Sequence, residues 1–256
     1  MGLKGRSRVL IKEMTRLTRR CALPWLRRIS PERYSDADPY KVILIPTQQI
    51  TRMQCRWRGP IDLPWLDAGR FGKYSSLLRR WHAGIVLEGD WDDATESIDD
   101  YHLSKIVHER FVLGKEWMDI HYVNKALRKV RNGEPAWGNR CQTTEEVFER
   151  CRYIDTLHAR LKSEGYNPGR AADPKQPFTH FLVNIGRGGE IIRNNDGKHR
   201  IILSKVIGVP RLPARVLVRH REWQSIRDAI RRDRNRELID RFQHHPDLQD
   251  VLPHTG

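Results

Sequence analysis

Residues 196–200 read Asp196-Gly197-Lys198-His199-Arg200, and this stretch decides both the fold and the candidate site. It stands between residues 191–192, which predict the return strand of a hairpin, and a helix that we expect over residues 198–207. The first N–H groups of a helix lack partners within the helix and lie at the positive end of its dipole. The stretch therefore predicts a strand, a turn and a helix whose N-terminus can hold a phosphate group.

The side chains of this turn suggest separate roles. Gly197 has no Cβ, so an anion can approach the backbone closely, and Lys198 and Arg200 add cationic donors. We assign these three residues to phosphate or nucleotide binding. Asp196 and His199 are the catalytic candidates: His199 as general acid/base, with Asp196 orienting it or holding a metal. The alternative interpretation is that Asp196 only caps the helix and His199 is structural.

The segments after residue 175 predict a small sheet. Residues 181–185 form a hydrophobic strand, and the paired glycines in residues 187–190 predict a hairpin turn, since tight turns need positive φ. Residues 212–218 alternate between apolar and other side chains, which predicts a strand with one buried face. A last arginine-rich helix is expected near Trp223, and we expect the tail after His244 to fray.

Helices dominate the segment before this sheet. The clearest begins at Thr143, which forms a capping box with Glu146, and Gly165 can end it. Two further helical stripes are expected at residues 98–111 and 117–130, and two short strands are expected at residues 42–45 and 85–87. The expected fold class is α/β, of the mixed α+β kind, with a helical, Trp-rich N-terminal part beside a small sheet.

The order of elements from Phe181 to Trp223 is similar to the ParB/sulfiredoxin superfamily: hydrophobic strand, glycine hairpin, DGxHR turn, helix, Gly-Val-Pro and final strand. The resemblance covers residues 150–223. More loosely, the chain resembles uncharacterised bacterial and archaeal proteins that pair a Gly-Asp-Trp-Asp turn, here 89–92, with Arg-His-x-x-Trp, here 219–223. We expect four segments along the chain: a basic amphipathic segment at 1–35, a helical or mixed region at 36–140, a ParB/sulfiredoxin-like domain at 141–223, and a basic helix and tail at 224–256.

The resemblance narrows the expected activity. Sulfiredoxins carry a catalytic cysteine where this chain has Lys198, so that chemistry is excluded. Partition ParB proteins bind CTP at a Gly-Glu-Arg-Arg turn, of which Gly197 and Arg200 match, while Lys198 replaces the glutamate. Free-serine kinases of this fold carry the Asp-Gly-x-His-Arg turn found here at 196–200. The resemblance thus implies ATP, ADP or CTP with Mg²⁺, and a phosphotransferase or nucleotide hydrolase.

A second candidate site is the acidic turn around Trp91. Asp90, Asp92 and Asp93 could supply oxygen ligands to Mg²⁺, and we assign Asp90 and Asp92 as metal ligands. The alternative interpretation is a helix start, in which Asp92 or Asp93 is the N-cap and the acids lie near the positive end of the dipole.

Charge sets the expected partners. The 256 residues carry a formal net charge of +15, which favours anionic partners: a nucleotide or phosphorylated small molecule, nucleic acid, or an acidic membrane surface. The alternative is that the charge serves solubility alone. Among residues 1–30, Leu10, Met14, Leu17 and Cys21 recur at helical spacing, so a basic helix could dock on a membrane or pack on the body. Pro24 should end or kink it.

Three function hypotheses follow. The first is the nucleotide-dependent enzyme above. The second is a DNA- or RNA-binding protein or nuclease of the ParB-like type, for which Trp57 between Arg56 and Arg58 is a candidate surface. The third is a non-catalytic adaptor docked at a membrane through residues 1–30. No segment is apolar enough to span a membrane, and the cysteines form no CxxC motif, so we expect a cytoplasmic protein with reduced thiols, peripheral to a membrane or the nucleoid in the second and third cases.

Overall fold

The chain divides into two compact units. Unit 1 comprises residues 1–96, 168–196 and 211–256, and unit 2 comprises residues 97–167 and 197–210. The computed structural model describes the following residues: 14, 17–18, 20–54, 84–93, 95–166, 181–194 and 197–253. The chain crosses between the units four times, so the units do not follow the linear segments expected from the sequence. Each unit is described by itself.

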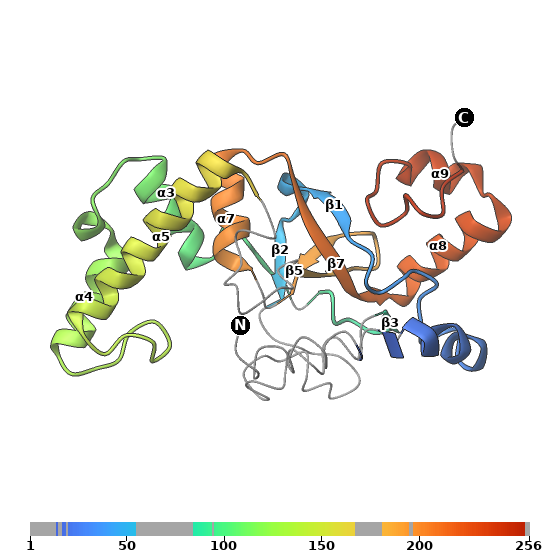
Figure 1. The fold of residues 1–256 in the computed structure, drawn as a ribbon, viewed down its shortest axis with the longest axis horizontal. Coiled ribbons are helices and arrows are strands. Elements are labelled where there is room, and N and C mark those ends of the chain that lie inside the picture. Colours follow the sequence, from blue (N-terminus) through green and yellow to red (C-terminus); the bar gives the residue numbers. More distant parts are fainter. Residues whose placement is uncertain are drawn as a thin grey trace. The chain divides into compact units, whose positions relative to one another are not determined.

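Unit 1 contains a mixed sheet of seven strands, ordered β1-β7-β5-β6-β2-β4 with β3 also pairing to β7 (Figure 1). The strands are β1 (Ile43–Pro46), β2 (Arg52–Gln54), β3 (Ile85–Leu87), β4 (Thr95–Ser97), β5 (Phe181–Ile185), β6 (Ile191–Arg193) and β7 (Arg211–His220). A short 3-10 helix, η1 (Thr47–Gln49), follows β1. Ser97, the last residue of β4, is the first residue of unit 2.

Strand β7 is the centre of this sheet. It pairs parallel with β5 and β3 and antiparallel with β1. Its first half alternates buried and half-buried residues, as the sequence pattern predicts, but every residue from Val216 to His220 is buried. The second half is covered on both faces because α8 (Arg221–Asp233) packs against β7 and β3.

The glycine turn predicted at 187–190 is confirmed. It joins β5 to β6 in an antiparallel hairpin with Ile185 opposite Ile191. Gly189 has φ +93°, and a Cβ added there would lie 2.7 Å from the ring of Trp223. Only glycine therefore suits this position, both for its backbone conformation and for the close approach of the indole.

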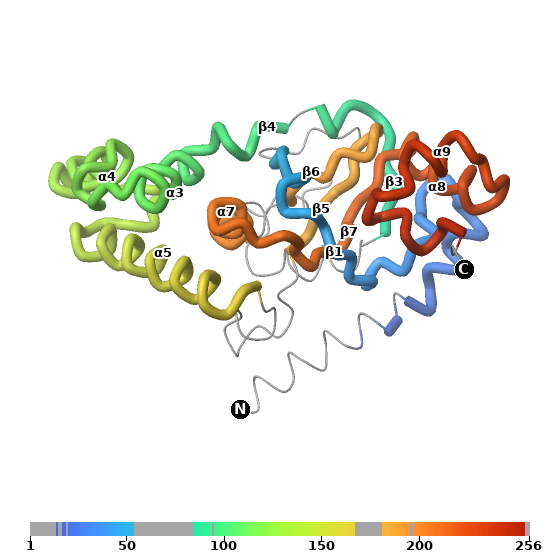
Figure 2. Tube along the Cα trace, turned by 90° about the horizontal axis from the view of Figure 1, so that it is seen from above, coloured from blue at the N-terminus to red at the C-terminus, as the bar shows by residue number. Residues whose placement is uncertain are grey.

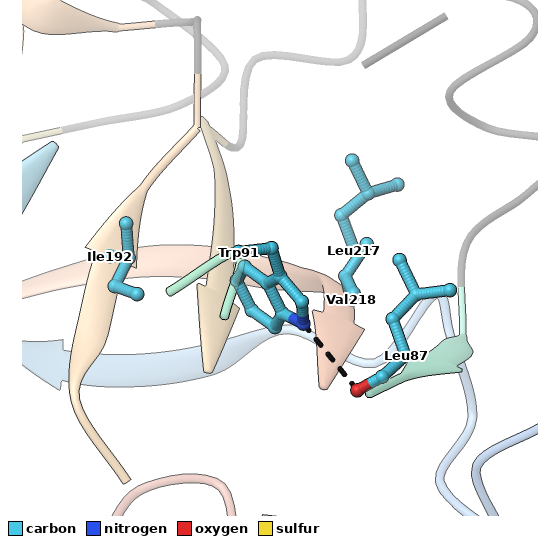
Figure 3. Packing of buried hydrophobic residues seen from close by; sticks show 5 residues of the cluster. All are labelled: Leu87, Trp91, Ile192, Leu217 and Val218. Atoms are coloured by element: carbon cyan, nitrogen blue, oxygen red, sulfur yellow. Dashed lines mark hydrogen bonds between the residues drawn. The ribbon is translucent and has the colours of Figure 1, made fainter. Parts of the chain in front are cut away.

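Trp91 is the fully buried centre of a hydrophobic cluster in unit 1 (Figure 3). It packs with Leu87, Ile192, Leu217 and Val218, and its indole N–H donates to the Leu87 carbonyl at 3.4 Å. The Gly-Asp-Trp-Asp turn is thus fixed to the sheet by its tryptophan.

The structure differs from the expectation at both chain ends. The helix near the N-terminus does not end at Pro24 but continues to Ile29. The segment after His244 does not fray, because Asp247, Leu248 and Val251 are buried. It follows α9 (Arg236–Phe242) and packs back onto unit 1 through a buried carboxylate described below. Charge pairing, which hydrophobic patterning does not reveal, holds this tail.

Unit 2 is helical. Its elements are α3 (His102–Phe111), η3 (Trp117–Asp119), α4 (His121–Arg131), α5 (Thr144–Glu164) and α7 (Lys198–Ile207). Helix α4 contacts α3 and α5, and α7 contacts α3 and α5 (Figure 2). The predicted capping box of Thr143 and Glu146 is present, and Gly165 ends α5 with φ +67°. The α/β fold class is confirmed, whereas the narrower likeness to ParB/sulfiredoxin domains stays a prediction.

Candidate functional site

The DGxHR turn leads into α7 of unit 2. Gly197 is the N-cap of α7, with the left-handed backbone angles φ 76° and ψ 12°, and no side chain caps the helix. The expected N-cap, Asp196, lies outside the described residues, so its catalytic role stays a prediction. The position of Gly197 has a plain reason: the chain must turn sharply into the helix, and glycine adopts this conformation without a steric penalty.

Lys198 and His199 line a cavity of about 710 Å³ that lies entirely within unit 2. We call it the basic pocket. Helices α3, α4 and α5, the loop of residues 135–140 and the start of α7 contribute its walls. Two residues that the sequence suggested for phosphate handling and proton transfer are thus brought to one concave site.

Five of the lining side chains are lysines or arginines: Lys125, Lys129, Arg140, Arg150 and Lys198. Among the described residues, no aspartate or glutamate lines the pocket. Lys125 and Lys129 share one side of α4 because residues four apart in a helix lie above one another. The other side of α4 is apolar and buried, which directs this pair away from the core. The pocket therefore presents an excess of positive charge to any ligand.

Lys198 is held by aromatic neighbours from the start of α3. Its ammonium donates to the Tyr101 hydroxyl at 2.9 Å and lies 5.3 Å from the centre of that ring. The ring of His102 is 4.1 Å from the ring of Tyr101. Burial lowers the pKa of His102, and the charge of Lys198 lowers it further, so this imidazole is neutral at neutral pH. A neutral imidazole beside a fixed ammonium can exchange a proton with a bound ligand.

The loop of residues 135–140 has an unusual backbone. Trp137, Gly138 and Asn139 are consecutive and have φ of 49°, 69° and 63°. The loop is closed by a β-bridge between Ala136 and Cys141. Left-handed backbone at a tryptophan costs energy, and such conformations concentrate at ligand-binding sites. The strain places Trp137 and Asn139 in the lining of the basic pocket.

A second tryptophan fixes another wall. Trp117 is buried, and its indole N–H donates to Asp155 on α5 at 2.7 Å. The guanidinium of Arg110 lies 5.3 Å from the Trp117 ring centre. The basic pocket therefore contains one tryptophan that is tied into the fold and one, Trp137, on a strained loop.

Arg200 does not lie where the sequence predicted, with Gly197 and Lys198 at a phosphate site. Its guanidinium donates to the Tyr166 hydroxyl at 3.2 Å, and it is not among the residues that line the basic pocket. A helix turns by 100° per residue, so consecutive positions of α7 cannot all face one cavity. Lys198 and His199 face the basic pocket, whereas Arg200 is hydrogen-bonded to Tyr166.

A second cavity of unit 2 offers a contrast. It measures about 500 Å³, and both acids and bases line it. Lys205 pairs there with Asp99 at 3.2 Å. Since its charges compensate one another, this cavity lacks the excess positive charge of the basic pocket.

The acidic turn of unit 1 is held by Arg187. Asp92 accepts from the Arg187 backbone N–H at 2.8 Å and from its guanidinium at 2.8 Å, and Asp90 accepts from the same guanidinium at 3.0 Å. Burial raises the pKa of Asp92, but the hydrogen bonds from Arg187 prevail and lower it. No helix starts here, because β4 follows the turn. Among the described residues no group of three or more His, Cys, Asp or Glu is arranged to hold a metal. Arg187 is the cation that contacts Asp90 and Asp92, and the assignment of these two carboxylates to Mg²⁺ stays a prediction.

The Gly-Asp-Trp-Asp turn (89–92) and the Arg-His-x-x-Trp segment (219–223) contact each other in unit 1. The imidazole Nε2 of His220 lies 2.9 Å from the Gly89 carbonyl oxygen, which joins the Arg-His-x-x-Trp segment to the Gly-Asp-Trp-Asp turn. Arg219 and Trp223 both donate to the buried Asp247, at 2.8 and 3.0 Å. These motif residues support the fold of unit 1.

Sequence reasoning missed most of the basic pocket. Tyr101, His102, Trp137 and Arg150 come from segments without a recognisable motif, and tertiary packing alone gathers them. The spacing of Lys125 and Lys129 was the one signal available, since two lysines four apart opposite an apolar stripe mark an exposed basic face. The surface predicted at Arg56, Trp57 and Arg58 lies outside the described residues.

Comparisons with known proteins give no match: no protein-family model, curated protein or solved structure is significantly similar to this chain. Within the described part of the chain, no helix combines the length and apolar character needed to cross a bilayer. The functional argument therefore depends on the geometry of the two units.

Proposed function

We propose that unit 2 binds a nucleotide in the basic pocket and acts on its phosphates as a phosphotransferase or nucleotide hydrolase. The single observation that carries this proposal is the lining: five cationic side chains converge on one cavity without an acidic one among the described residues. Nucleotide phosphates carry several negative charges, and lysine and arginine are the side chains that bind them.

The aromatic residues of the pocket support a nucleotide over a bare phosphate. Trp137 lines the cavity from the strained loop, and Tyr101 and Tyr122 line it from α3 and α4. Base–aromatic stacking contributes roughly 1–3 kcal/mol per base. Asn139 lies in the same loop, and its amide can both donate to and accept from the edge of a base. The cavity volume of about 710 Å³ lies in the range of small-molecule sites.

His199 is the proposed proton carrier. It lines the pocket beside Lys198, where it can take the proton of an attacking hydroxyl or water as the bond to the terminal phosphoryl group forms. The bond from that phosphorus to the leaving oxygen breaks, and the shortened nucleotide leaves. Lys198 and the other cations offset the charge on the phosphoryl oxygens, which is the main task in phosphoryl transfer.

The described lining of the basic pocket does not fit a protein-bound Mg²⁺ ion. Magnesium prefers oxygen ligands and is usually held by carboxylates, and no carboxylate is present among the described residues that line this cavity. The lysines and arginines instead offset the charge of the phosphates directly. We therefore assign no step to a metal.

Isothermal titration tests the proposal with ATP, ADP, CTP and pyrophosphate. The variant Arg150→Ala removes a lining cation, and Arg152→Ala on the same helix removes an exposed arginine outside the lining. We expect about tenfold weaker binding for Arg150→Ala, equal to about 1.4 kcal/mol, and no change for Arg152→Ala. Absence of binding by the wild type, or an equal loss in both variants, would falsify the proposal.

One further variant and one further ligand decide between a nucleotide and the alternative ligands. Trp137→Ala should weaken ATP binding but leave pyrophosphate binding unchanged, because only ATP has a base to stack. Single-stranded DNA tests nucleic-acid binding, whose affinity falls steeply with salt. If DNA displaces ATP and binds more tightly at low salt, the polynucleotide is the physiological ligand and the enzyme assignment fails.

A further inference from the structure

A second functional surface lies on the helix near the N-terminus, in unit 1. Residues 14, 17–18 and 20–29 are helical. One face holds the helix to the unit: Leu23 is buried near Gly84, and Arg27 pairs with Asp36 at 3.3 Å and Asp228 at 2.9 Å. The helix is therefore anchored along one side.

The opposite side is apolar and exposed. Met14, Leu17, Trp25 and Ile29 are 59%, 58%, 63% and 60% exposed, and Cys21 is exposed as well. We call these five residues the apolar stripe. At 100° per residue they fall within an arc of about 120° centred opposite Leu23. Exposed large apolar side chains are ordinary when scattered, but a continuous stripe on one helix face marks an interaction surface.

Charge complementarity indicates what covers the stripe. Residues 1–30 contain nine lysines and arginines and a single acid, Glu13. Arg28 is exposed and, at 100° per residue, lies within the arc of the stripe, between Leu17 and Cys21. Basic side chains flanking an apolar face that includes tryptophan are typical of helices that lie in the interface of an anionic membrane.

A folded protein partner fits less well. Five side chains are few beside the roughly 20–30 residues that each partner contributes to a standard protein interface. A bilayer surface requires no shape complementarity and adapts to a narrow stripe. Anionic lipid headgroups also attract basic residues of the segment.

We propose that the apolar stripe docks unit 1 on a surface of anionic phospholipids, with the helix parallel to the membrane plane. Met14, Leu17, Cys21, Trp25 and Ile29 enter the boundary between headgroups and acyl chains. The exposed Arg28 contacts lipid phosphates. This surface belongs to unit 1 and does not depend on the nucleotide proposal.

Co-sedimentation with vesicles tests the docking surface. The full chain should pellet with phosphatidylcholine/phosphatidylglycerol vesicles, less with phosphatidylcholine alone, and less at high salt. The double variant Trp25→Ser/Ile29→Ser should partition about tenfold more weakly. The matched control is Val112→Ser/Leu113→Ser, which changes the C-cap of α3 and the residue after it, whose side chains are 54% and 57% exposed. It should bind as the wild type does.

A fluorophore on Cys21 gives a second readout. Cys141 and Cys151 are buried, so a Cys55→Ser background directs the label to the stripe. Insertion predicts a blue shift of an environment-sensitive dye with anionic vesicles. The proposal is overturned if the wild type does not pellet, if the control loses binding equally, or if light scattering shows a dimer that Trp25→Ser/Ile29→Ser dissociates while vesicles remain unbound.

Discussion

Arginines and lysines have opposite surroundings in the two units. In unit 1, Arg227 is completely buried and lies between Asp36, Asp247 and Asp250, at 3.3, 3.7 and 3.1 Å. In unit 2, the cations of the basic pocket surround a cavity whose described lining includes no carboxylate. The same residue types thus support the fold in one unit and form a candidate ligand site in the other.

The contrast explains why net charge alone is a weak guide to function. A buried cation must be paired with a carboxylate, because transferring an ion from water into the protein interior costs far more free energy than leaving it at the surface. Arg227 meets that requirement with carboxylates that are far apart in the sequence. Cations at a cavity remain hydrated and do not need protein partners, so they can serve a ligand. Four predictions test whether the two groups of cations differ in this way.

The largest effect is expected from Asp247→Asn in unit 1. Asp247 is buried and accepts from Arg219 and Trp223, and the loss of its charge leaves Arg219 and Arg227 undercompensated. We expect the free energy of unfolding to fall by about 3–5 kcal/mol in urea titrations. Asp240→Asn on α9, where the aspartate is exposed, should change it by less than about 0.5 kcal/mol. Equal stability of the two variants would show that the buried pairs are not structural.

The same carboxylate predicts a stability loss at acid pH. Burial raises the pKa of Asp247, but Arg219 and Arg227 prevail and lower it to about 2. A lowered folded-state pKa gives stability that is complete above the unfolded pKa of about 3.9 and is lost as the pH falls toward 2. Thermal melts should show a contribution of about 2 kcal/mol disappearing in this window. The variant Asp247→Asn should lack this pH-dependent contribution to stability. The contributions of Asp92 and Asp250, whose pKa values are also lowered, should remain in the variant. An unchanged pH profile in the variant contradicts the assignment.

Removing cations of the basic pocket should lower ligand affinity and leave stability almost unchanged. Lys125→Ala/Lys129→Ala removes two exposed lysines of α4, and the only ion pair affected is Lys129 with Glu134 at 3.4 Å among the described residues. We expect a stability change below about 0.5 kcal/mol. ATP affinity should fall at least tenfold, or about 1.4 kcal/mol. Arg128→Ala, from the same helix but outside the lining, is the control. If the double variant unfolds instead, its lysines belong with the structural cations of unit 1.

Much of the fold could be predicted from local sequence. The capping box at Thr143 and the glycine turn near Gly189 each depend on neighbouring residues, and each is confirmed. The apolar alternation of β7 holds only in its first half, because the residues from Val216 on are buried on both faces. The tail after His244 could not be predicted in this way. Its order depends on Asp247 reaching arginines that lie 20 and 28 residues earlier in the chain.

The candidate site was only partly predictable, for the same reason. Lys198 and His199 belong to a motif that can be recognised, and both line the basic pocket. Tyr101, Trp137 and Arg150 reach the pocket from three other segments, and no local pattern marks them. The acidic turn shows the same limit, because the distant partner of Asp90 and Asp92, Arg187, could not be found from local sequence.

Arg200→Ala gives the smallest expected effect and the sharpest test of the motif. The DGxHR interpretation assigns Arg200 to the phosphates and so expects a loss of more than tenfold in ATP affinity. In unit 2 its guanidinium is instead hydrogen-bonded to Tyr166, outside the lining of the basic pocket. We therefore expect affinity to change by less than about twofold, or about 0.4 kcal/mol. The lost hydrogen bond should lower stability by roughly 0.5–1.5 kcal/mol. Tyr166→Phe removes the same hydrogen bond but keeps the guanidinium, so it should reproduce the stability loss. If Arg200→Ala loses ATP binding and Tyr166→Phe does not, the guanidinium contacts the ligand, and the turn at the start of α7 is the phosphate site.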